Sequence, residues 1–209
     1  MLEPILTAGQ KELLAAERAL LAEVTSGLER SEASGEDLQA LADSVLQLDE
    51  LFLLVVVGEF NAGKSALINA LLGEKVLAEG VTPTTSKIHH ITWGEELSRE
   101  PMGAVGERIS APVETLRQVT IVDTPGTNAL DRAHEALTTD YVPRADLVLF
   151  VTSADRPVSE SERVFLETIK RWGKKVAMVV NKIDILRSDG ERAEVAAYVK
   201  DNASRLLEA

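Results

Sequence analysis

The chain has 209 residues, with 22 Lys or Arg against 34 Asp or Glu, and a formal net charge of −12. This excess of acid disfavours a general nucleic-acid binder and broad adhesion to anionic lipid, because both need clustered basic side chains. The chain has no cysteine, which excludes disulfides and fits a cytoplasmic location. Its longest apolar run, Leu51–Val57, is too short to cross a membrane.

The first fifty residues are predicted to form a helical segment, residues 1–50, ahead of the catalytic domain. Leu14, Leu21 and Leu28 recur every seven residues and predict a helix over 8–29. Apolar residues at steps of three and four predict a second helix over 36–50. We expect a helical hairpin, which either packs on itself or on the following domain, or belongs to a bundle completed by residues outside this chain.

From residue 51 onward, strands alternate with helices, which predicts one α/β domain over residues 51–209. Continuous apolar runs are typical of strands buried on both faces of a parallel sheet. The expected strands are 51–57, 87–93, 119–122, 146–152 and 176–180, and the expected helices are 62–72, 159–172 and 191–208. In the helix over 159–172, the side chains expected to face the sheet are Val164, Phe165, Ile169 and Trp172. Residues 94–118 are ambiguous and could hold a loop, a short strand and a helical turn.

The string GEFNAGKS at Gly58–Ser65 matches the phosphate-loop pattern G-x-x-x-x-G-K-[ST]. It follows an apolar strand and opens a helix, as this loop requires. Gly58 and Gly63 allow the backbone to wrap around a phosphate. Lys64 is expected to reach the β- and γ-phosphates, and Ser65 to ligate Mg²⁺. The nucleotide-binding residues expected here are Gly58, Glu59, Phe60, Asn61, Ala62, Gly63, Lys64, Ser65 and Ala66.

The string VDTPG ends another apolar strand and supplies two more expected contacts. Asp123 is placed to hold Mg²⁺ through water, and the amide of Gly126 can sense the γ-phosphate. Small switch GTPases often carry a Gln next, to orient the attacking water, but this chain has Thr127. His134 is the nearest titratable candidate for that role, and otherwise a surface residue.

A second protein ligand for Mg²⁺ is expected between the first helix and the second strand of the domain. The string VTPTTS supplies Thr82, Thr84 and Thr85 there. We favour Thr84 or Thr85, and assign both to the metal site and to catalysis with Lys64. The alternative is a plain turn rich in Thr.

The string NKID follows the strand VAMVV, so it lies at the carboxyl end of a strand, where open α/β sheets bind ligands. The Asp184 carboxylate can accept hydrogen bonds from guanine N1–H and from its exocyclic amine. Adenine offers neither donor in that place. Asn181 is expected to brace the loop, and the stem of Lys182 to cover the base. These residues predict binding of GTP and GDP.

Asn61 has two possible roles within the phosphate loop. An Asn at this position resembles GTPases whose catalysis depends on bound K⁺, which can stand in for an arginine finger. In that role Asn61 is catalytic and helps to hold the cation between the phosphates. In the other role it only stabilises the loop.

With these residues placed, the chain resembles bacterial dynamin-like proteins. The strings that carry the resemblance cover roughly residues 50–187: GEFNAGKSALINALLGEKVL, EGVTPTTSKI, VDTPGTN, YVPRADLVLFVTSADRPVSESERVFL and WGKKVAMVVNKID. The resemblance implies a P-loop GTPase fold, Mg²⁺-dependent GTP hydrolysis, dimerisation through GTPase domains, and membrane remodelling. It also implies a location that is cytoplasmic or peripheral at the membrane, with membrane contact through regions absent from this chain.

The chain departs from that family in length. Dynamin-like proteins carry a helical stalk and a lipid-binding tip, and GTPases usually have a further guanine-contacting loop that would fall beyond Ala209. We therefore expect the last strand and helix of the domain to be missing. Two other functions are considered: a cation-activated switch GTPase in RNA modification or ribosome assembly, and a module that binds nucleotide without turnover. The net charge of −12 argues against the RNA-binding surface that the first of these needs.

Overall fold

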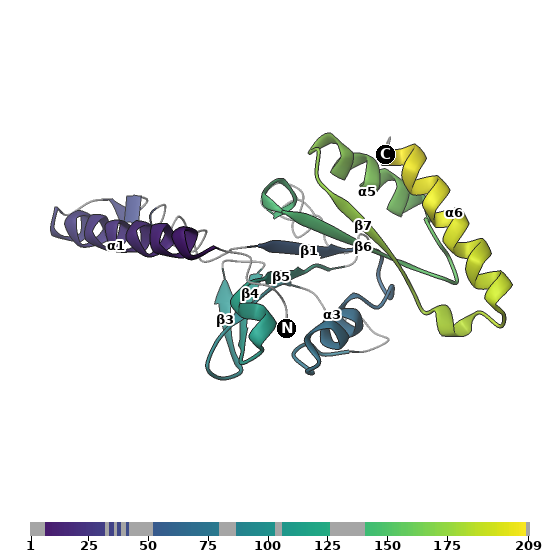
Figure 1. Ribbon diagram of the computed structural model, residues 1–209, viewed down its shortest axis with the longest axis horizontal. Coiled ribbons are helices and arrows are strands. Elements are labelled where there is room, and N and C mark those ends of the chain that lie inside the picture. Colours follow the sequence, from purple (N-terminus) through teal and green to yellow (C-terminus); the bar gives the residue numbers. More distant parts are fainter. Residues whose placement is uncertain are drawn as a thin grey trace. The chain divides into compact units, whose positions relative to one another are not determined.

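The computed structural model describes residues 7–31, 34–35, 37–38, 41, 52–79, 87–102, 106–125 and 141–207. The chain divides into two compact units, Met1–Leu51 and Phe52–Ala209, and each is described by itself (Figure 1). None of the described helices is long and apolar enough to cross a membrane.

The first unit contains helix α1, Ala8–Arg30, which confirms the helix predicted over 8–29. Its start is fixed by a capping box, in which the Thr7 amide donates to Gln10 Oε1 at 2.8 Å and the Gln10 amide donates to Thr7 Oγ1 at 3.4 Å. The helix ends at Ser31, whose amide donates to the carbonyls of Gly27 and Leu28. The second predicted helix, over 36–50, lies mostly outside the described residues.

The second unit is built on a seven-stranded sheet with the order β3-β4-β2-β5-β1-β6-β7. The strands are β1 Leu53–Val57, β2 Ile88–Trp93, β3 Ser98–Met102, β4 Gly106–Ala111, β5 Thr120–Asp123, β6 Leu147–Ser153 and β7 Val176–Asn181. The helices are α3 Lys64–Leu72, α5 Glu160–Arg171 and α6 Asp189–Leu207, with short 3-10 turns at Glu114–Arg117, Val142–Arg144 and Ile183–Ile185.

The sheet is mostly parallel, as expected, but it is mixed. The pairs β1–β5, β1–β6, β2–β4 and β6–β7 are parallel, whereas β2–β5 and β3–β4 are antiparallel. The ambiguous stretch 94–118 contains two strands, β3 and β4, and a 3-10 turn. The predicted α/β class, a mainly parallel sheet flanked by helices, is confirmed.

Two apolar cores cover opposite faces of the sheet. Val55 and Val57 of β1 belong to the core that packs on α5 and α6, whereas Val56 belongs to the core that contains Ile68 of α3. This division follows from the two-residue period of a strand, which sends neighbouring side chains to opposite faces. Because β1 is central and buried on both faces, its carboxyl end is a rigid base for the loop that follows.

Helix α5 shows where the predicted inner face was partly wrong. Phe165 and Ile169 are buried as expected, but Val164 is 57% exposed and Trp172 is 46% exposed. Successive helical residues are about 100° apart, so Val164 points away from the side that Phe165 buries. Trp172 is the C-cap residue, beyond the last helical turn.

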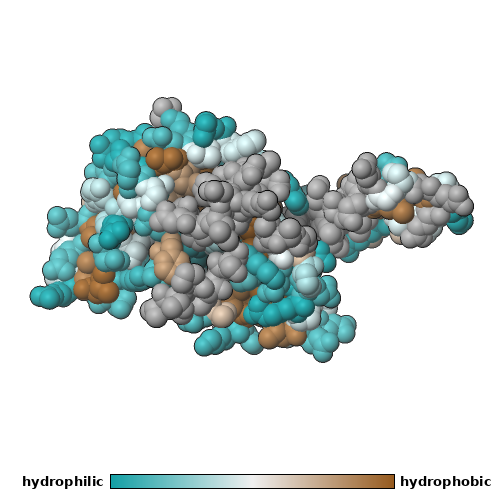
Figure 2. Space-filling model, turned by 180° about the vertical axis from the view of Figure 1, so that it is seen from behind, coloured by the Kyte–Doolittle hydropathy of each residue, from teal (hydrophilic) through white to brown (hydrophobic). Residues whose placement is uncertain are grey.

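On the face drawn in Figure 2, the coloured residues are mostly hydrophilic, and the hydrophobic ones form small separate groups. Such scattered exposure is normal for a protein surface.

A buried polar contact joins the end of β6 to the start of α5. Thr152 Oγ1 donates to Glu162 Oε2 at 2.8 Å and accepts from the Val158 amide at 3.0 Å, and the Ser159 amide donates to Glu162 Oε2 at 3.1 Å. Thr152 and Glu162 are both inaccessible to solvent. Burial raises the pKa of Glu162 above its ordinary value.

We predict that Thr152→Val will lower the free energy of unfolding by about 1–3 kcal/mol, because the Val158 amide and the buried Glu162 carboxyl each lose a partner. Urea unfolding followed by circular dichroism measures the change. Thr168→Val is the matched control, since Thr168 Oγ1 donates to its own helix, to the Val164 carbonyl at 3.1 Å. The control should stay within about 0.5 kcal/mol of the wild type. Equal effects of the two substitutions would contradict the structural role of Thr152.

Candidate nucleotide and metal site

The phosphate loop runs from Gly58 to Gly63, between β1 and α3. Its backbone has positive φ angles at Gly58 (150°), Asn61 (63°) and Gly63 (87°). A Cβ at Gly58 would collide with the Val151 carbonyl on β6, and one at Gly63 would collide with the Asn181 side-chain amide. Glycine is therefore required at both positions by conformation and by space.

Lys64 is the first residue of α3 and is only 7% exposed. Its Nζ donates to the carbonyl oxygens of Gly58 and Glu59, each at 3.0 Å, and so spans the mouth of the loop. Burial lowers the pKa of Lys64, while the carboxylates of Asp123, Glu162 and Glu59 oppose that shift. The ammonium group lies where it can exchange these carbonyls for phosphate oxygens.

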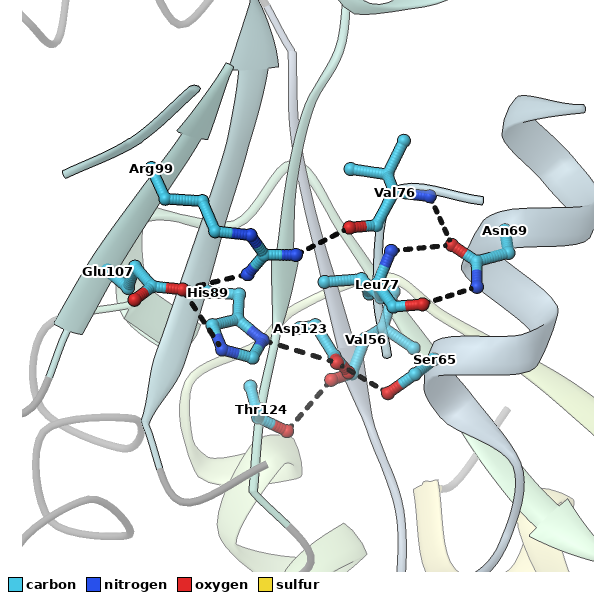
Figure 3. A network of polar contacts seen from close by, with 10 residues as sticks. All are labelled: Val56, Ser65, Asn69, Val76, Leu77, His89, Arg99, Glu107, Asp123 and Thr124. Carbon is cyan, nitrogen blue, oxygen red and sulfur yellow. Dashed lines mark hydrogen bonds and ion pairs between the residues drawn. The ribbon is translucent and has the colours of Figure 1, made fainter. Parts of the chain in front are cut away.

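Ser65 and Asp123 lie 58 positions apart in the sequence and meet at the carboxyl ends of the strands (Figure 3). Ser65 Oγ donates to Asp123 Oδ2 at 2.8 Å, and Asp123 is fully buried at the end of β5. Thr124 Oγ1 donates to the Val56 carbonyl at 2.9 Å and fixes the chain just after Asp123. Among the described residues, Asp123 Oδ1 has no hydrogen-bond partner. A buried carboxylate beside a serine hydroxyl, with one oxygen unused, suits a hard cation such as Mg²⁺.

The NKID segment begins at the carboxyl end of β7, on the same side of the sheet as the phosphate loop and Asp123. Asn181 Nδ2 donates to the Ala62 carbonyl at 2.9 Å and lies 3.4 Å from the Gly63 carbonyl, so this side chain braces the phosphate loop. Lys182 takes a left-handed conformation with a φ of 58°, which turns the chain into the 3-10 turn Ile183–Ile185. Asp184 lies in that turn and is exposed, so its carboxylate can reach a base.

A polar cavity of about 230 Å³ lies beside the phosphate loop. It is lined by Glu59, Phe60, Asn61, Ala62, Ser153, Asp155, Arg156, Glu162 and Lys182. The Glu59 carboxylate accepts hydrogen bonds from the hydroxyls of Ser159 and Ser161 at the start of α5. The loop is thus tied to β7 through Asn181 and to α5 through Glu59.

Several predicted residues lie outside the described part of the chain. They are Thr82, Thr84, Thr85, Gly126, Thr127 and His134. The second Mg²⁺ ligand, the γ-phosphate contact and the residue that positions water therefore stay predictions. The assignments of Gly58 to Ala66, Asp123, Asn181, Lys182 and Asp184 as nucleotide contacts are also proposals, although the fold brings these residues to the carboxyl ends of the strands.

Three polar residues that the sequence analysis missed form a row that reaches Asp123 through His89. His89 Nδ1 is 3.9 Å from Asp123 Oδ2, and His89 Nε2 is 3.7 Å from Glu107 Oε2. Arg99 Nη1 donates to Glu107 Oε2 at 2.9 Å (Figure 3). These residues come from β2, β4 and β3, and only the strand register brings them together, so no local sequence pattern pointed to them.

Comparison with known proteins identifies the domain. The family model described as 50S ribosome-binding GTPase matches residues 53–182. A probable transmembrane GTPase FZO-like, chloroplastic, from Arabidopsis thaliana is 42% identical over 205 residues, which is 95% of this chain and 22% of that protein. The tRNA modification GTPase MnmE of Thermotoga petrophila is 32% identical, over 81% of this chain and 34% of its own length.

A bacterial dynamin-like protein from Nostoc punctiforme is 29% identical, over 80% of this chain and 30% of that protein. Among solved structures, an oligomerised bacterial dynamin pair, described as a mechanism for long-range sensing and tethering of membranes, has a TM-score of 0.64. That match has 20% identity and covers 99% of this chain and 39% of the other, and it shows the shared fold. The chain thus spans about a fifth to a third of the length of these three relatives.

The family match covers most of the sheet, including the phosphate loop and Asn181. The similarity to the FZO-like GTPase and to bacterial dynamin-like proteins confirms the resemblance drawn from the sequence. The chain belongs to the 50S ribosome-binding GTPase family, and its GTPase domain is related to those of dynamin-like proteins.

Proposed function

We propose that this chain is the GTP-binding and GTP-hydrolysing head of a dynamin-like protein, with residues 1–50 as a helical neck and 51–209 as the GTPase domain. The observation that carries the proposal is that the phosphate loop contacts both the VDTPG and the NKID segments at the carboxyl ends of the strands. Ser65 contacts Asp123 at 2.8 Å, and Asn181 contacts the Ala62 carbonyl at 2.9 Å. Phosphate, metal and base contacts are thereby held in one fixed arrangement.

In this arrangement each side chain has a defined task. The loop amides and Lys64 bind the phosphates, and Lys64 leaves the carbonyls of Gly58 and Glu59 to do so. Ser65 and Asp123 would hold Mg²⁺, with Thr84 or Thr85 as the further ligand. The metal, when bound, neutralises charge that develops on the β- and γ-phosphate oxygens. Asp184 selects guanine, and Lys182 covers the base.

We further propose that Asn61 helps to hold K⁺ and that heads activate one another in a nucleotide-dependent homodimer. Asn61 lines the polar cavity beside the loop, which supports a role outside the phosphate cradle itself. The names of the bacterial dynamin relatives support membrane remodelling by the full-length protein, through regions absent from this chain. We propose a cytoplasmic or membrane-peripheral location, whereas the FZO-like relative is described as a transmembrane, chloroplastic GTPase.

A second candidate function is a cation-activated GTPase in RNA modification or ribosome assembly. The similarity to a tRNA modification GTPase and the description of the matching family favour it. It requires a basic surface for RNA, which a net charge of −12 does not favour. RNA binding that weakens steeply with added salt would support this candidate against the first.

We predict that Gly63→Ala will abolish measurable GTP binding, because a Cβ at this φ of 87° meets the Asn181 amide. Titration with a fluorescent GTP analogue tests this. Gly73→Ala is the matched control, since Gly73 has a similar φ of 70° but open space around its Cβ position. The control should lose about 1 kcal/mol of stability and keep its GTP affinity. A Gly63→Ala variant with wild-type affinity would contradict the assignment of the loop.

We predict that Asp184→Asn will lower the preference for GTP over ATP by at least about tenfold, because the amide cannot accept from both guanine donors. Xanthosine triphosphate, which has a carbonyl in place of the exocyclic amine, should bind the variant better than the wild type does. Competition binding measures both effects. Asp201→Asn, at an exposed position of α6, should leave the preference unchanged. An Asp184→Asn variant as selective as the wild type would exclude the base-reading role.

GTP turnover per molecule, measured against protein concentration in K⁺ and in Tris buffer, tests dimerisation and the cation together. We expect specific activity to rise with concentration only in K⁺, and Asn61→Ala to lose most of the K⁺ stimulation. Lys64→Ala defines the background, because it should not bind nucleotide. A rate that does not depend on concentration would exclude activation by a second head. Equal rates in both buffers would exclude the K⁺ role.

A further inference from the structure

A row of polar side chains crosses three neighbouring strands and ends at Asp123. In the sheet register, His89 of β2 is paired with Glu107 of β4 on one side and with Asp123 of β5 on the other. Directly paired residues of neighbouring strands point to the same face. The imidazole therefore lies between two carboxylates, 3.9 Å from Asp123 and 3.7 Å from Glu107 (Figure 3).

The contact between His89 and Asp123 is incomplete. The distances from His89 to Asp123 and to Glu107 are both longer than a direct N–H···O hydrogen bond, which is at most about 3.2 Å. Within the described part of the chain, His89 Nδ1 and Asp123 Oδ1 are buried and lack hydrogen-bond partners. Buried polar atoms without partners are costly, so their presence together marks a place prepared for another group. At this position that group is the hydrated cation that Ser65 and Asp123 would hold.

The outer end of the row is anchored by Arg99. Its Nη1 donates to Glu107 Oε2 at 2.9 Å, and its Nη2 donates to the Val76 carbonyl at 2.8 Å. Because Arg99 already donates to the Glu107 carboxylate, an imidazole N–H of His89 is available to Asp123. The row thus directs the ring toward the metal site.

The Val76 contact adds a link to the predicted Thr ligands. Asn69 of α3 accepts from the Val76 and Leu77 amides at 3.0 and 2.9 Å and donates to the Leu77 carbonyl at 2.9 Å. Arg99 and Asn69 together fix the chain just before residues 80–86, and β2, with His89, begins just after them. The chain just before residues 80–86 is therefore linked to the polar row through Arg99, and the strand just after them contributes His89 to the same row.

We propose that His89, held by Glu107 and Arg99, is a positioning residue that orients the Asp123 carboxylate and so raises the affinity of the site for Mg²⁺. This inference rests on the proposed nucleotide and Mg²⁺ site. Loss of a partner that orients a metal ligand typically costs 10–100-fold in metal affinity. Arg99 and Glu107 act through His89, so their loss should have a smaller effect in the same direction.

The release rate of a fluorescent GDP, measured across a Mg²⁺ titration and again in EDTA, tests the proposal. The variants are His89→Ala, Glu107→Gln and Arg99→Gln. We expect the Mg²⁺ concentration that half-maximally slows release to rise about tenfold in His89→Ala. Release in EDTA should stay within about twofold of the wild type, because the phosphate loop and NKID segment are untouched. A double variant, His89→Ala with Arg99→Gln, should show no further shift, since both act through one side chain.

Arg163→Gln is the control, because Arg163 makes a comparable ion pair, 3.8 Å from Glu160, far along the sequence and on the surface of α5. An unchanged Mg²⁺ midpoint in all three variants would overturn the proposal. So would equal acceleration with Mg²⁺ and in EDTA, which indicates general damage to the site. If His89→Ala fails to fold, the more exposed Glu107→Gln and Arg99→Gln decide the question. A wild-type chain that binds no GDP would instead overturn the proposed function, and this inference with it.

Discussion

The close approach of the phosphate loop to its neighbouring strands is the constraint on which the site depends. The backbone at Gly58 passes against the Val151 carbonyl of β6, and the backbone at Gly63 passes against the Asn181 side chain at the end of β7. Neither approach leaves space for a Cβ. The parallel order β5-β1-β6-β7 brings the carboxyl ends of these strands together, so the arrangement that forms the sheet also gathers the residues proposed to contact phosphate, metal and base.

The antiparallel pairing of β2 with β5 has a separate consequence. It sets His89 opposite Asp123 and carries the polar row outward through Glu107 to Arg99. A purely parallel sheet would still have placed Asp123 beside Ser65, because that contact needs only β1, β5 and α3. The strands β2, β4 and β3 add the polar row that links Asp123 to Val76, ahead of the segment that contains Thr84 and Thr85. The site therefore has two parts, one common to the parallel core and one built on the edge strands.

Sequence reasoning succeeded where the strand, the glycine-containing loop and the following helix are encoded locally. Glycines, Lys64 and Ser65 lie within eight consecutive residues, and the run before them is apolar enough to identify a central strand. It failed where the relevant neighbours are distant. The segment SREPM of β3 is polar and contains Pro101, because an edge strand need not be buried and can tolerate a missing amide. The His89 row depends on register, which no short window of sequence specifies.

The error in α5 has a similar origin. Val164 is apolar and next to Phe165, yet the buried face of this helix is completed by Glu162, whose carboxyl is satisfied by Thr152. A polarity pattern alone assigns the glutamate to solvent and the valine to the core. The buried glutamate fits here only because the hydroxyl of Thr152 and the Ser159 amide reach it, which is a tertiary condition.

The electrostatic balance of the site supports the proposal that nucleotide binds together with cations. Lys64 is surrounded by the carboxylates of Asp123, Glu162 and Glu59, all of which favour its charged form. A triphosphate adds further negative charge to this edge, and one buried ammonium cannot compensate all of it. Ser65 and Asp123 would hold a Mg²⁺ ion whose charge would compensate the phosphates on one side of the loop. Asn61, which lines the polar cavity on the other side, offers a neutral oxygen that can bind a monovalent cation without adding charge. The acidic surroundings of the phosphate loop thus favour the cation-dependent role of Asn61 over a purely structural one.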